Sequence, residues 1–338
     1  MHTDEPSPLV ALRRMIVGYR LSQALFVAAE LGIADLLKDG PRSIDALAQA
    51  TGTHPPSLYR VLRLLASEGV FIEHEQRHFG LTPLAVPLQS DVPGTLRSRA
   101  LFDSTDCNWR AWGQLRHGVM TGGAVFEHAF EMPFFDYLQQ HPSPAVRFDA
   151  LQADQTLPWA RAIVEAYDFS SVGTLVDVGG GYGSLLSAIL SAHPRMRGVL
   201  YDLPHVIAGA QPRLTATAVT DRCEALAGDF FVAVPPGGDT YLLKHILHDW
   251  EDERCLTILQ NCRRAMPSEG RLLVVEVIIP PDNEPDYGKY LDLNMMVLLR
   301  GQERTEAEYR QLFAASGFTL SRVIATPSEV SVIEGRPV

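Results

Sequence analysis

Cysteine is scarce in this sequence, and the few that occur are spread along the chain. The 338 residues include four cysteines and no CxxC pair: Cys107, Cys223, Cys255 and Cys262. This usage argues against a disulfide framework. We expect reduced thiols in a cytoplasmic protein.

Excess positive charge and long apolar runs are also missing. Asp and Glu number 40 against 29 Lys and Arg, so the formal net charge is −11. Such a chain is poorly suited to nucleic acid or to an anionic membrane surface. No apolar run is long enough to span a bilayer, and the opening MHTDEPSP is acidic and polar, unlike a secretory signal. We therefore expect no nucleic-acid partner and no membrane association.

The first hundred residues predict short helices followed by a hairpin. Apolar residues recur at helical spacing in LSQALFVAAELGIADLLKDGP and PPSLYRVLRLLASEGVF, and FIEHEQRHFGLT is typical of two short strands. This order is that of a winged helix. A DNA-binding role would need a basic face, and the candidate recognition helix offers only Arg60 and Arg63. We therefore favour a packing or dimerisation domain over a DNA-binding one.

Strands alternate with helices in the second half of the chain. Residues 101–165 are helical in pattern and rich in aromatic side chains, whereas from about residue 172 apolar strands and helices take turns. That alternation predicts a parallel sheet covered by helices on both faces. The last segment, FTLSRVIATPSEVSVIEGRP, predicts two strands around a turn, which fits an antiparallel edge.

A glycine-rich turn follows the first of these strands. In LVDVGGGYGSLL, Gly179, Gly181 and Gly183 separate a strand from a helix, and glycine there lets a ligand approach the backbone closely. Position 184 is serine, so the G-x-G-x-x-G spacing of a dinucleotide-binding turn is missing. No lysine or arginine lies near the glycines to hold a phosphate. The spacing argues against an NAD-dependent oxidoreductase.

Acidic residues end the next two strands. Asp202 closes RGVLYD, where a carboxylate can hold the two hydroxyls of a ribose, and Asp229 follows in GDFF. Together with the glycines they predict a nucleoside ligand bound with few phosphate contacts.

Five stretches of this chain resemble one enzyme family. VDVGGGYG, YDLPHVI, GDFF, LLKHILHDWEDERC and GQERTEAEYRQLF are similar to the S-adenosylmethionine-dependent O-methyltransferases of the caffeic-acid, hydroxyindole and antibiotic-tailoring type. The resemblance covers nearly the whole chain. It implies an α/β fold in three parts: a winged-helix-like dimerisation domain at 1–100, a helical substrate-pocket region at 101–165, and a Rossmann-like methyltransferase domain at 166–338 with a mostly parallel seven-stranded sheet. It also implies S-adenosylmethionine as cofactor and a homodimer.

The resemblance further implies roles for individual residues. Gly179 and Gly181 would lie against the amino-acid and ribose parts of the cofactor, with Asp202 on the ribose. Asp229 and Phe230 would flank the adenine, and Lys244 would lie near the cofactor. The residues that would border the acceptor are Phe130, Phe148, Asn294 and Met295. Departures from the family pattern, such as Arg300-Gly301-Gln302 before the ERT motif, leave the acceptor open.

Two histidines stand three positions apart in YLLKHILHDW. If this stretch is a strand, side chains alternate, and His245 and His248 face opposite ways. A metal site needs converging ligands, so we predict none. His248 would end the strand, at the edge where open α/β sheets bind ligands. We predict that His248 is a general base and that His245 packs against a helix.

A base suits methyl transfer to a phenol. A phenol has a pKa near ~10 and is a weak nucleophile at neutral pH, while an imidazole can take its proton. Such a base needs an orienting acid, and the resemblance places Glu276 and Glu303 beside it. Independently, Glu276 in the apolar strand LLVVEVIIP needs a buried partner. Asp249 is expected to cap the following helix.

These observations predict an O-methyltransferase acting on a small aromatic natural product. Two alternatives stay open at this point. One is transfer to nitrogen or carbon by the same fold, because a fold does not fix the acceptor. The other is a winged-helix regulator with a nucleoside-sensing domain.

Overall fold

The structure is a computed structural model that describes residues 7–215 and 217–338, so the start of the polar segment MHTDEPSP lies outside the described residues. The chain forms two compact units. One combines Met1–Arg110 with Leu138–Asp154, and the other combines Ala111–Tyr137 with Gln155–Val338. The chain thus passes between the units three times. The division into three consecutive segments stays a prediction.

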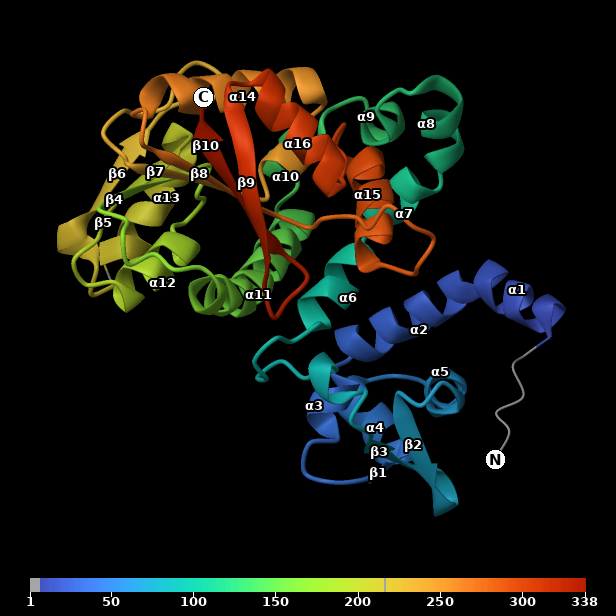
Figure 1. Cartoon of the computed structure of the whole chain (residues 1–338). Helices are drawn as coiled ribbons and strands as arrows, with labels where there is room; N and C mark the ends of the chain where they lie inside the picture. The colour runs from blue at the N-terminus through green and yellow to red at the C-terminus, as the bar shows by residue number, and fades with distance from the viewer. Residues whose placement is uncertain (1–6, 216) are drawn as a thin grey trace. The chain divides into compact units, whose positions relative to one another are not determined.

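The first unit holds the expected short helices and a small antiparallel sheet (Figure 1). α4 begins where Ser43 Oγ accepts the N–H of Ala46, and it ends at Gly52 in the left-handed region (φ 66°). The predicted hairpin is present as β2 and β3. β3 also pairs with β1, a strand of two residues that is too short to show an alternation of apolar and polar residues in the sequence. The elements are α1 (Pro8–Ile16), α2 (Gly18–Glu30), α3 (Ile33–Leu36), β1 (Arg42–Ser43), α4 (Ile44–Thr51), α5 (Pro55–Ser67), β2 (Phe71–His74), β3 (His78–Leu81) and α6 (Arg97–Asp103).

Short helices lead from there into the second unit. α7 (Asp106–Trp112), α10 (Phe134–Gln140) and α11 (Pro142–Ala166) each contain a point at which the chain changes unit. α8 (Leu115–Thr121) and α9 (Val125–Phe130) lie wholly within the second unit. The helical prediction for this region is confirmed.

The second unit is built on a seven-stranded sheet of order β6-β5-β4-β7-β8-β10-β9. The first five of these strands are parallel, and β10 runs antiparallel to both β8 and β9, as predicted. Figure 1 shows β9 and β10 in red beside the C-terminus. The strands are β4 (Thr174–Val178), β5 (Arg197–Asp202), β6 (Cys223–Ala227), β7 (Thr240–Lys244), β8 (Arg271–Glu276), β9 (Phe318–Ala325) and β10 (Ser331–Pro337).

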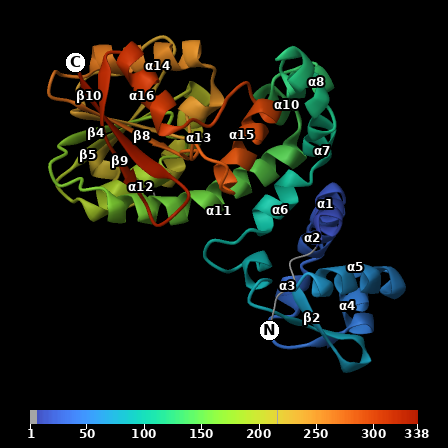
Figure 2. The ribbon, with the colours of Figure 1, turned by 45° about the vertical axis from the view of Figure 1, so that its right-hand side comes forward.

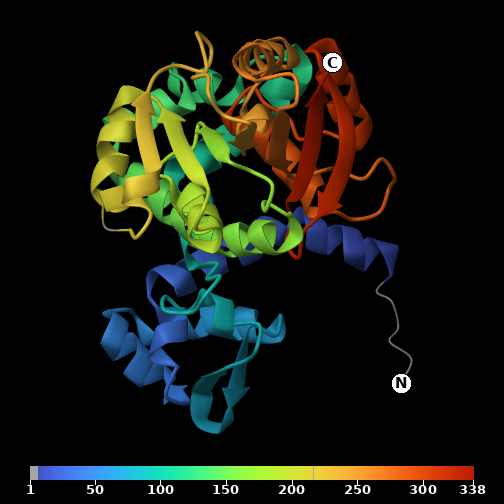
Figure 3. The same cartoon turned by 60° about the vertical axis from the view of Figure 1, so that its left-hand side comes forward.

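Helices cover both faces of this sheet because its strands are apolar on both sides (Figures 2 and 3). One buried cluster joins the sheet to the end of α11, α12 (Ser184–Ala192) and α13 (Pro204–Thr215). A second joins it to α14 (Asp252–Ala265) and α16 (Glu306–Ala315) on the other face. α15 (Tyr287–Leu298) contacts α8 and α9.

The order of the strands reverses direction at β4. From β4 the chain moves outward to β5 and β6, and then returns to place β7 and β8 on the other side of β4. The connections after β4 and β7 therefore diverge, and open α/β sheets bind ligands at such a switch point. Among the described residues, no helix is both long enough and apolar enough to cross a membrane.

Candidate active site

Polar residues gather at the carboxyl ends of the four neighbouring strands β5, β4, β7 and β8. Asp202, Lys244 and Glu276 are the last residues of β5, β7 and β8, and Asp177 is the last but one of β4. Since parallel strands end at the same edge, the fold brings these side chains to one edge of the sheet.

The glycine loop after β4 is shaped by left-handed backbone at Gly179, Gly181 and Gly183 (φ 71°, 59° and 77°). The N–H of Gly181 donates to Oδ2 of Asp202 at 2.8 Å, and that of Leu203 donates to Oδ1 at 2.7 Å. Burial raises the pKa of Asp202, although these two hydrogen bonds oppose the rise. A Cβ on Gly181 would meet nothing within 4 Å, so there is room for a ligand over the loop beside the Asp202 carboxylate.

Phe230 reaches the same loop from the segment after β6. A Cβ built on Gly179 would lie 3.4 Å from Cε1 of Phe230 and 2.5 Å from Cδ1 of Ile246. The segment is held by Asp229, whose Oδ1 accepts the N–H of Phe231 at 2.8 Å, and by Asn261, whose Nδ2 donates to the Phe230 carbonyl at 2.7 Å. Gly179, Asp229 and Phe230 are therefore brought together.

A buried acid and a buried base lie below the loop. Burial raises the pKa of Asp177 to about 7 and lowers the pKa of Lys244, and the mutual attraction of the two groups opposes both shifts. Oδ2 of Asp177 is buried without a hydrogen bond. The ammonium of Lys244 lies 5.1 Å from the ring centroid of Trp159. Asp177 was not singled out from the sequence, although a carboxylate within the apolar strand LVDV is the same signal that identified Glu276.

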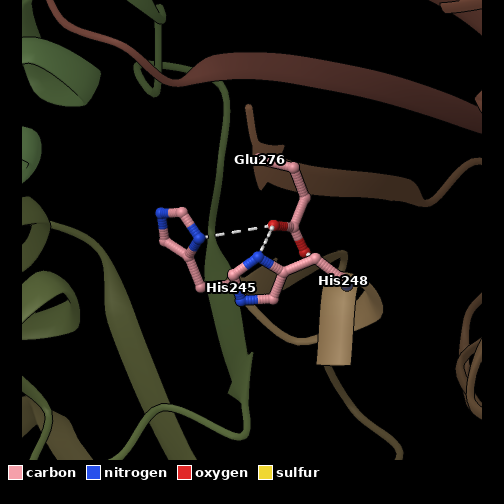
Figure 4. Close-up of side chains that lie close together, drawn as sticks. All are labelled: His245, His248 and Glu276. Atoms are coloured by element: carbon pink, nitrogen blue, oxygen red, sulfur yellow. Dashed lines mark hydrogen bonds and ion pairs between the residues drawn. The ribbon is translucent and has the colours of Figure 1, made fainter. Parts of the chain in front are cut away.

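The two histidines do not face opposite ways, so that prediction was wrong (Figure 4). β7 ends at Lys244, and His245 adopts the left-handed region (φ 51°) before a 3₁₀ turn at Leu247–Asp249. Side chains alternate only within the strand, and this turn brings the imidazoles to a centroid distance of 4.7 Å. Their Nδ1 atoms lie 3.4 Å and 3.6 Å from Oε2 of Glu276. His245 also lies 4.6 Å from the Trp159 ring of α11, which confirms its packing against a helix.

His248 is surrounded by carboxylates. Its Nδ1 lies 2.6 Å from Oε1 of Glu303, and its Nε2 lies 3.3 Å from Oδ1 of Asp249. Burial alone would lower the pKa of His248, but the charges of Glu276, Asp249 and Glu303 outweigh it and raise the pKa to about 10. The short contact fits an Nδ1–H that donates to Glu303, so that in the neutral form of the imidazole Nε2 is the proton acceptor.

Glu276 organises the loop that carries His248. Its Oε1 accepts the backbone N–H groups of Ile246 and Leu247, each at 3.0 Å. Its Oε2 has no hydrogen bond and contacts the two imidazoles instead. Burial raises the pKa of Glu276. The buried partner expected for this strand carboxylate is thus the histidine loop.

Neither Glu303 nor Asp249 caps a helix. Glu303 is buried and its N–H donates to Asp292, while α16 begins with a capping box between Thr305 and Glu308. The capping role expected for Asp249 was wrong, because the residue before α14 is Glu251. Asp249 stays in the 3₁₀ turn, where it contacts His248.

The side chains of His245, His248 and Glu276 offer nitrogen and oxygen atoms that could bind a metal ion. One atom each from His245, His248 and Glu276 lies within 4.8 Å of the others, and zinc accepts imidazole and carboxylate ligands. The reason given above against a metal, divergent imidazoles, therefore does not hold. In the structure, however, Nδ1 of His248 is hydrogen-bonded to Glu303, which is the arrangement of a base with its orienting acid.

The four predicted acceptor residues fall in two different units. In the second unit, Asn294 Oδ1 accepts the N–H of Trp112 at 3.3 Å, Met295 is buried in α15, and Phe130 stacks on Phe126 with centroids 4.6 Å apart. Phe148 belongs to the first unit, where its ring lies 5.3 Å from Phe102. The structure thus groups three of them on α9 and α15, two helices in contact.

The parallel sheet, its glycine loop and the acid at the end of β5 define a nucleoside-binding domain of Rossmann-like type. Residues 112–319 match the O-methyltransferase domain, and residues 14–91 match the O-methyltransferase dimerisation domain. The chain belongs to this O-methyltransferase family and is an S-adenosylmethionine-dependent methyltransferase.

Individual relatives match over nearly their whole length. A phenazine O-methyltransferase from Lysobacter antibioticus is 50% identical over 97% of this chain and 96% of its own. A riboflavin-analogue enzyme of Streptomyces davaonensis, 8-amino-8-demethylriboflavin N,N-dimethyltransferase, is 34% identical over 99% of this chain and 97% of its own. The crystal structure of CalO1, a methyltransferase of calicheamicin biosynthesis solved with S-adenosylhomocysteine bound, superposes with a TM-score of 0.89 at 37% identity, covering 99% of this chain and 100% of that one.

Proposed function

We propose that this enzyme transfers a methyl group to a hydroxyl of a small aromatic natural product, with His248 as the general base. The observation that carries the proposal is the buried contact of 2.6 Å between His248 Nδ1 and Glu303. The relatives support the acceptor class, since their names include a phenazine O-methyltransferase and an enzyme of calicheamicin biosynthesis.

S-adenosylmethionine, when bound, supplies a methyl group on a positively charged sulfonium. The residues of the chain fit this cofactor: there is open space over Gly181, and Asp202 stands beside it to hold the ribose. Gly179 and Phe230 would border the cofactor from two sides, with Asp229 anchoring the Phe230 segment. Lys244 would help to fix the charge near the cofactor through its interaction with Asp177.

His248 would take the proton of the acceptor at Nε2 as its oxygen becomes nucleophilic. A phenol has a pKa near ~10, and the three carboxylates raise the pKa of His248 into the same range, to about 10. Proton transfer between groups of similar pKa is nearly balanced in free energy, so the imidazole can receive the proton without a large cost. Glu303 would hold the ring in place, and Glu276 would hold the loop that carries it.

The acceptor would lie against α9 and α15. Phe130, Asn294 and Met295 come from these helices and provide an aromatic ring, an amide and a thioether, which suit a flat acceptor with polar substituents. Phe148, in the first unit, stays a prediction of the family resemblance. A homodimer through the first unit is proposed because the dimerisation domain matches residues 14–91.

Transfer to nitrogen is the second candidate, and one relative is named as an N,N-dimethyltransferase. An aromatic amine is already nucleophilic when neutral and loses its proton after the methyl group arrives. It therefore gains little from a base poised beforehand. The carboxylate cluster around His248 favours oxygen.

A panel of aromatic acceptors tests the proposal. Purified enzyme with S-adenosylmethionine should methylate hydroxylated aromatic compounds, and His248→Ala should lower kcat by about 10²–10⁴-fold with little change in cofactor affinity. His54→Ala, at an exposed histidine of the first unit, is the matched control. Methylation of aryl amines only, or a His248→Ala enzyme as active as wild type, would contradict the proposal.

A further inference from the structure

The base and its orienting acid sit on two irregular segments. His248 lies on residues 245–251 between β7 and α14, and Glu303 lies on residues 299–305 between α15 and α16. The N–H of Gln302 donates to the His248 carbonyl at 2.9 Å, and a Cβ on Gly301 would lie 1.8 Å from that carbonyl oxygen. The two segments are therefore packed without a gap, but backbone contact alone does not set the side chains.

Arg304 joins these two segments from within the protein. Its side chain is 1% exposed and follows Glu303 directly. Nη1 donates to the carbonyls of Leu247 at 3.0 Å and Gln302 at 3.4 Å, and Nη2 donates to the carbonyl of Trp250 at 2.9 Å. The guanidinium thus binds the residues on both sides of the His248–Asp249 pair and the residue before Glu303.

The remaining donors of Arg304 meet at Asp252, the first residue of α14. Oδ1 of Asp252 accepts from Nε at 3.0 Å and from Nη2 at 2.7 Å. The side-chain amide of Gln302 donates to the same oxygen at 3.1 Å. Every N–H of the guanidinium has an acceptor, and the ammonium of lysine, with three donors instead of five, cannot bind all of them.

A buried charge is an expensive way to stabilise a fold. A buried ion pair often stabilises the folded state no more than apolar side chains of the same volume would. A buried guanidinium held mainly by carbonyl groups therefore indicates that this part of the fold needs a specific geometry. The contacts of Arg304 join the His248 turn to the segment that carries Glu303. Misplacement of a catalytic group by about 1 Å can cost about 10²-fold in rate.

We infer that Arg304 is a positioning residue that holds His248 Nδ1 on Glu303, with Asp252 as its anchor. This inference rests on the proposed role of His248 as base. Arg304 itself touches neither acceptor nor cofactor in this proposal. It acts on the reaction only through the orientation of the imidazole.

The test is a double-mutant cycle between Arg304→Lys and Glu303→Gln. Arg304→Lys should lower kcat by about 10- to 100-fold and leave the acceptor KM and the calorimetric Kd of S-adenosylmethionine within about threefold of wild type. In the Glu303→Gln background, Arg304→Lys should lower kcat little further, because the charged contact between His248 and Glu303 is already lost. Additive losses would overturn the inference.

A pH profile separates positioning from general structural support. Loosening the contact with Glu303 removes part of the interaction that favours the imidazolium, so the acidic limb of kcat should move to lower pH in Arg304→Lys. A drop in kcat with an unmoved limb would indicate a structural role only and would overturn the inference. Arg310→Lys, at an exposed arginine paired with Glu306, is the matched control and should change neither quantity.

Asp252→Asn provides the same test from the exposed end of the network. The Asp252 side chain is 63% exposed, so its substitution disturbs folding less than a change at buried Arg304. Asp252→Asn should move the acidic limb of the kcat profile to lower pH by a smaller amount than Arg304→Lys. An unmoved acidic limb would overturn the inference even if Arg304→Lys does not fold. A His248→Ala enzyme with wild-type kcat would instead overturn the proposed function itself.

Discussion

The Nδ1 atom of His248 lies 2.6 Å from Oε1 of Glu303, although the two residues are 55 positions apart in the chain. The contact depends on two features that come from different parts of the sequence. One is the left-handed residue His245, which turns the chain out of β7, and the other is Gly301, which lets the Glu303 segment approach the His248 carbonyl. The base and its acid are therefore products of the fold and not of a local motif.

The first prediction concerns pH. His248 must be neutral to accept a proton, and its pKa is raised to about 10, so kcat at saturating substrates should rise with pH across the neutral and alkaline range. Glu303→Gln removes a negative charge beside the imidazole, which lowers the pKa of His248 and moves the acidic limb to lower pH. The plateau should also fall, since a weaker base transfers the proton less well. Rate profiles of both enzymes with one phenolic acceptor check this; superimposable limbs would contradict it.

The second prediction concerns the cofactor. Asp202 accepts the N–H groups of Gly181 and Leu203 and would bind the ribose. Asp202→Ala should weaken S-adenosylmethionine binding by about 10- to 100-fold, the cost expected for losing charge-assisted hydrogen bonds. Isothermal titration calorimetry measures it. Asp221→Ala, at an exposed aspartate, should bind like wild type, and equal affinities for both variants would remove Asp202 from the cofactor site.

The third prediction separates backbone strain from crowding in the glycine loop. Gly179 and Gly122 have similar φ angles, 71° and 66°, so alanine at either costs about 1–2 kcal/mol of left-handed strain. Only at Gly179 would the new Cβ also collide, at 2.5 Å from Cδ1 of Ile246. Gly179→Ala should therefore lower the free energy of unfolding by roughly 1–3 kcal/mol more than Gly122→Ala. Denaturant unfolding of both variants gives the difference, and equal losses would show that Ile246 moves aside freely.

The fourth prediction concerns a buried acid remote from the chemistry. Glu334 on β10 is 2% exposed and accepts hydrogen bonds from Tyr167 at 2.7 Å, Arg322 at 2.9 Å and Arg336 at 3.0 Å. Burial alone would raise the pKa of Glu334, but these partners lower it below its ordinary value. Its contribution to stability is thus present above the pKa of the unfolded chain and is lost as pH falls through the folded pKa.

Glu334→Gln should lower the free energy of unfolding at pH 7 by about 1–3 kcal/mol and leave kcat unchanged. The difference in the free energy of unfolding between variant and wild type should narrow under acidic conditions, because the wild-type Glu334 carboxylate is then protonated. Unfolding curves at neutral and acidic pH check both parts. A gap that widens on acidification would mean that the sign of the pKa shift is wrong.

The sequence was sufficient to predict the sheet, and it indicated several residues of the candidate site. The parallel strands could be predicted because strands buried on both faces are continuous apolar runs in the sequence. Glu276 could be singled out because it is the one carboxylate in its apolar run. The orientation of the His245 side chain could not be predicted from the sequence. It depends on one residue in a left-handed conformation, which few residues other than glycine adopt and which no spacing rule indicates. The Arg304 network was missed for a related reason, since its acceptors are mostly backbone carbonyls, which leave no mark in the sequence.

The last prediction concerns metal ions. The proposed base works through Glu303 and Glu276 and uses only groups of the chain, so kcat should survive exhaustive dialysis against EDTA. Added Zn²⁺ should inhibit, because the imidazoles and Glu276 offer ligand atoms within 4.8 Å of one another, and an ion there would occupy Nδ1 of His248 in place of the hydrogen bond to Glu303. Inhibition should be reversed by EDTA and should weaken in His245→Asn, in which asparagine tolerates the left-handed backbone but lacks the imidazole. Loss of activity on chelation, restored by a divalent ion, would instead make the cluster a metal centre and would replace the base mechanism.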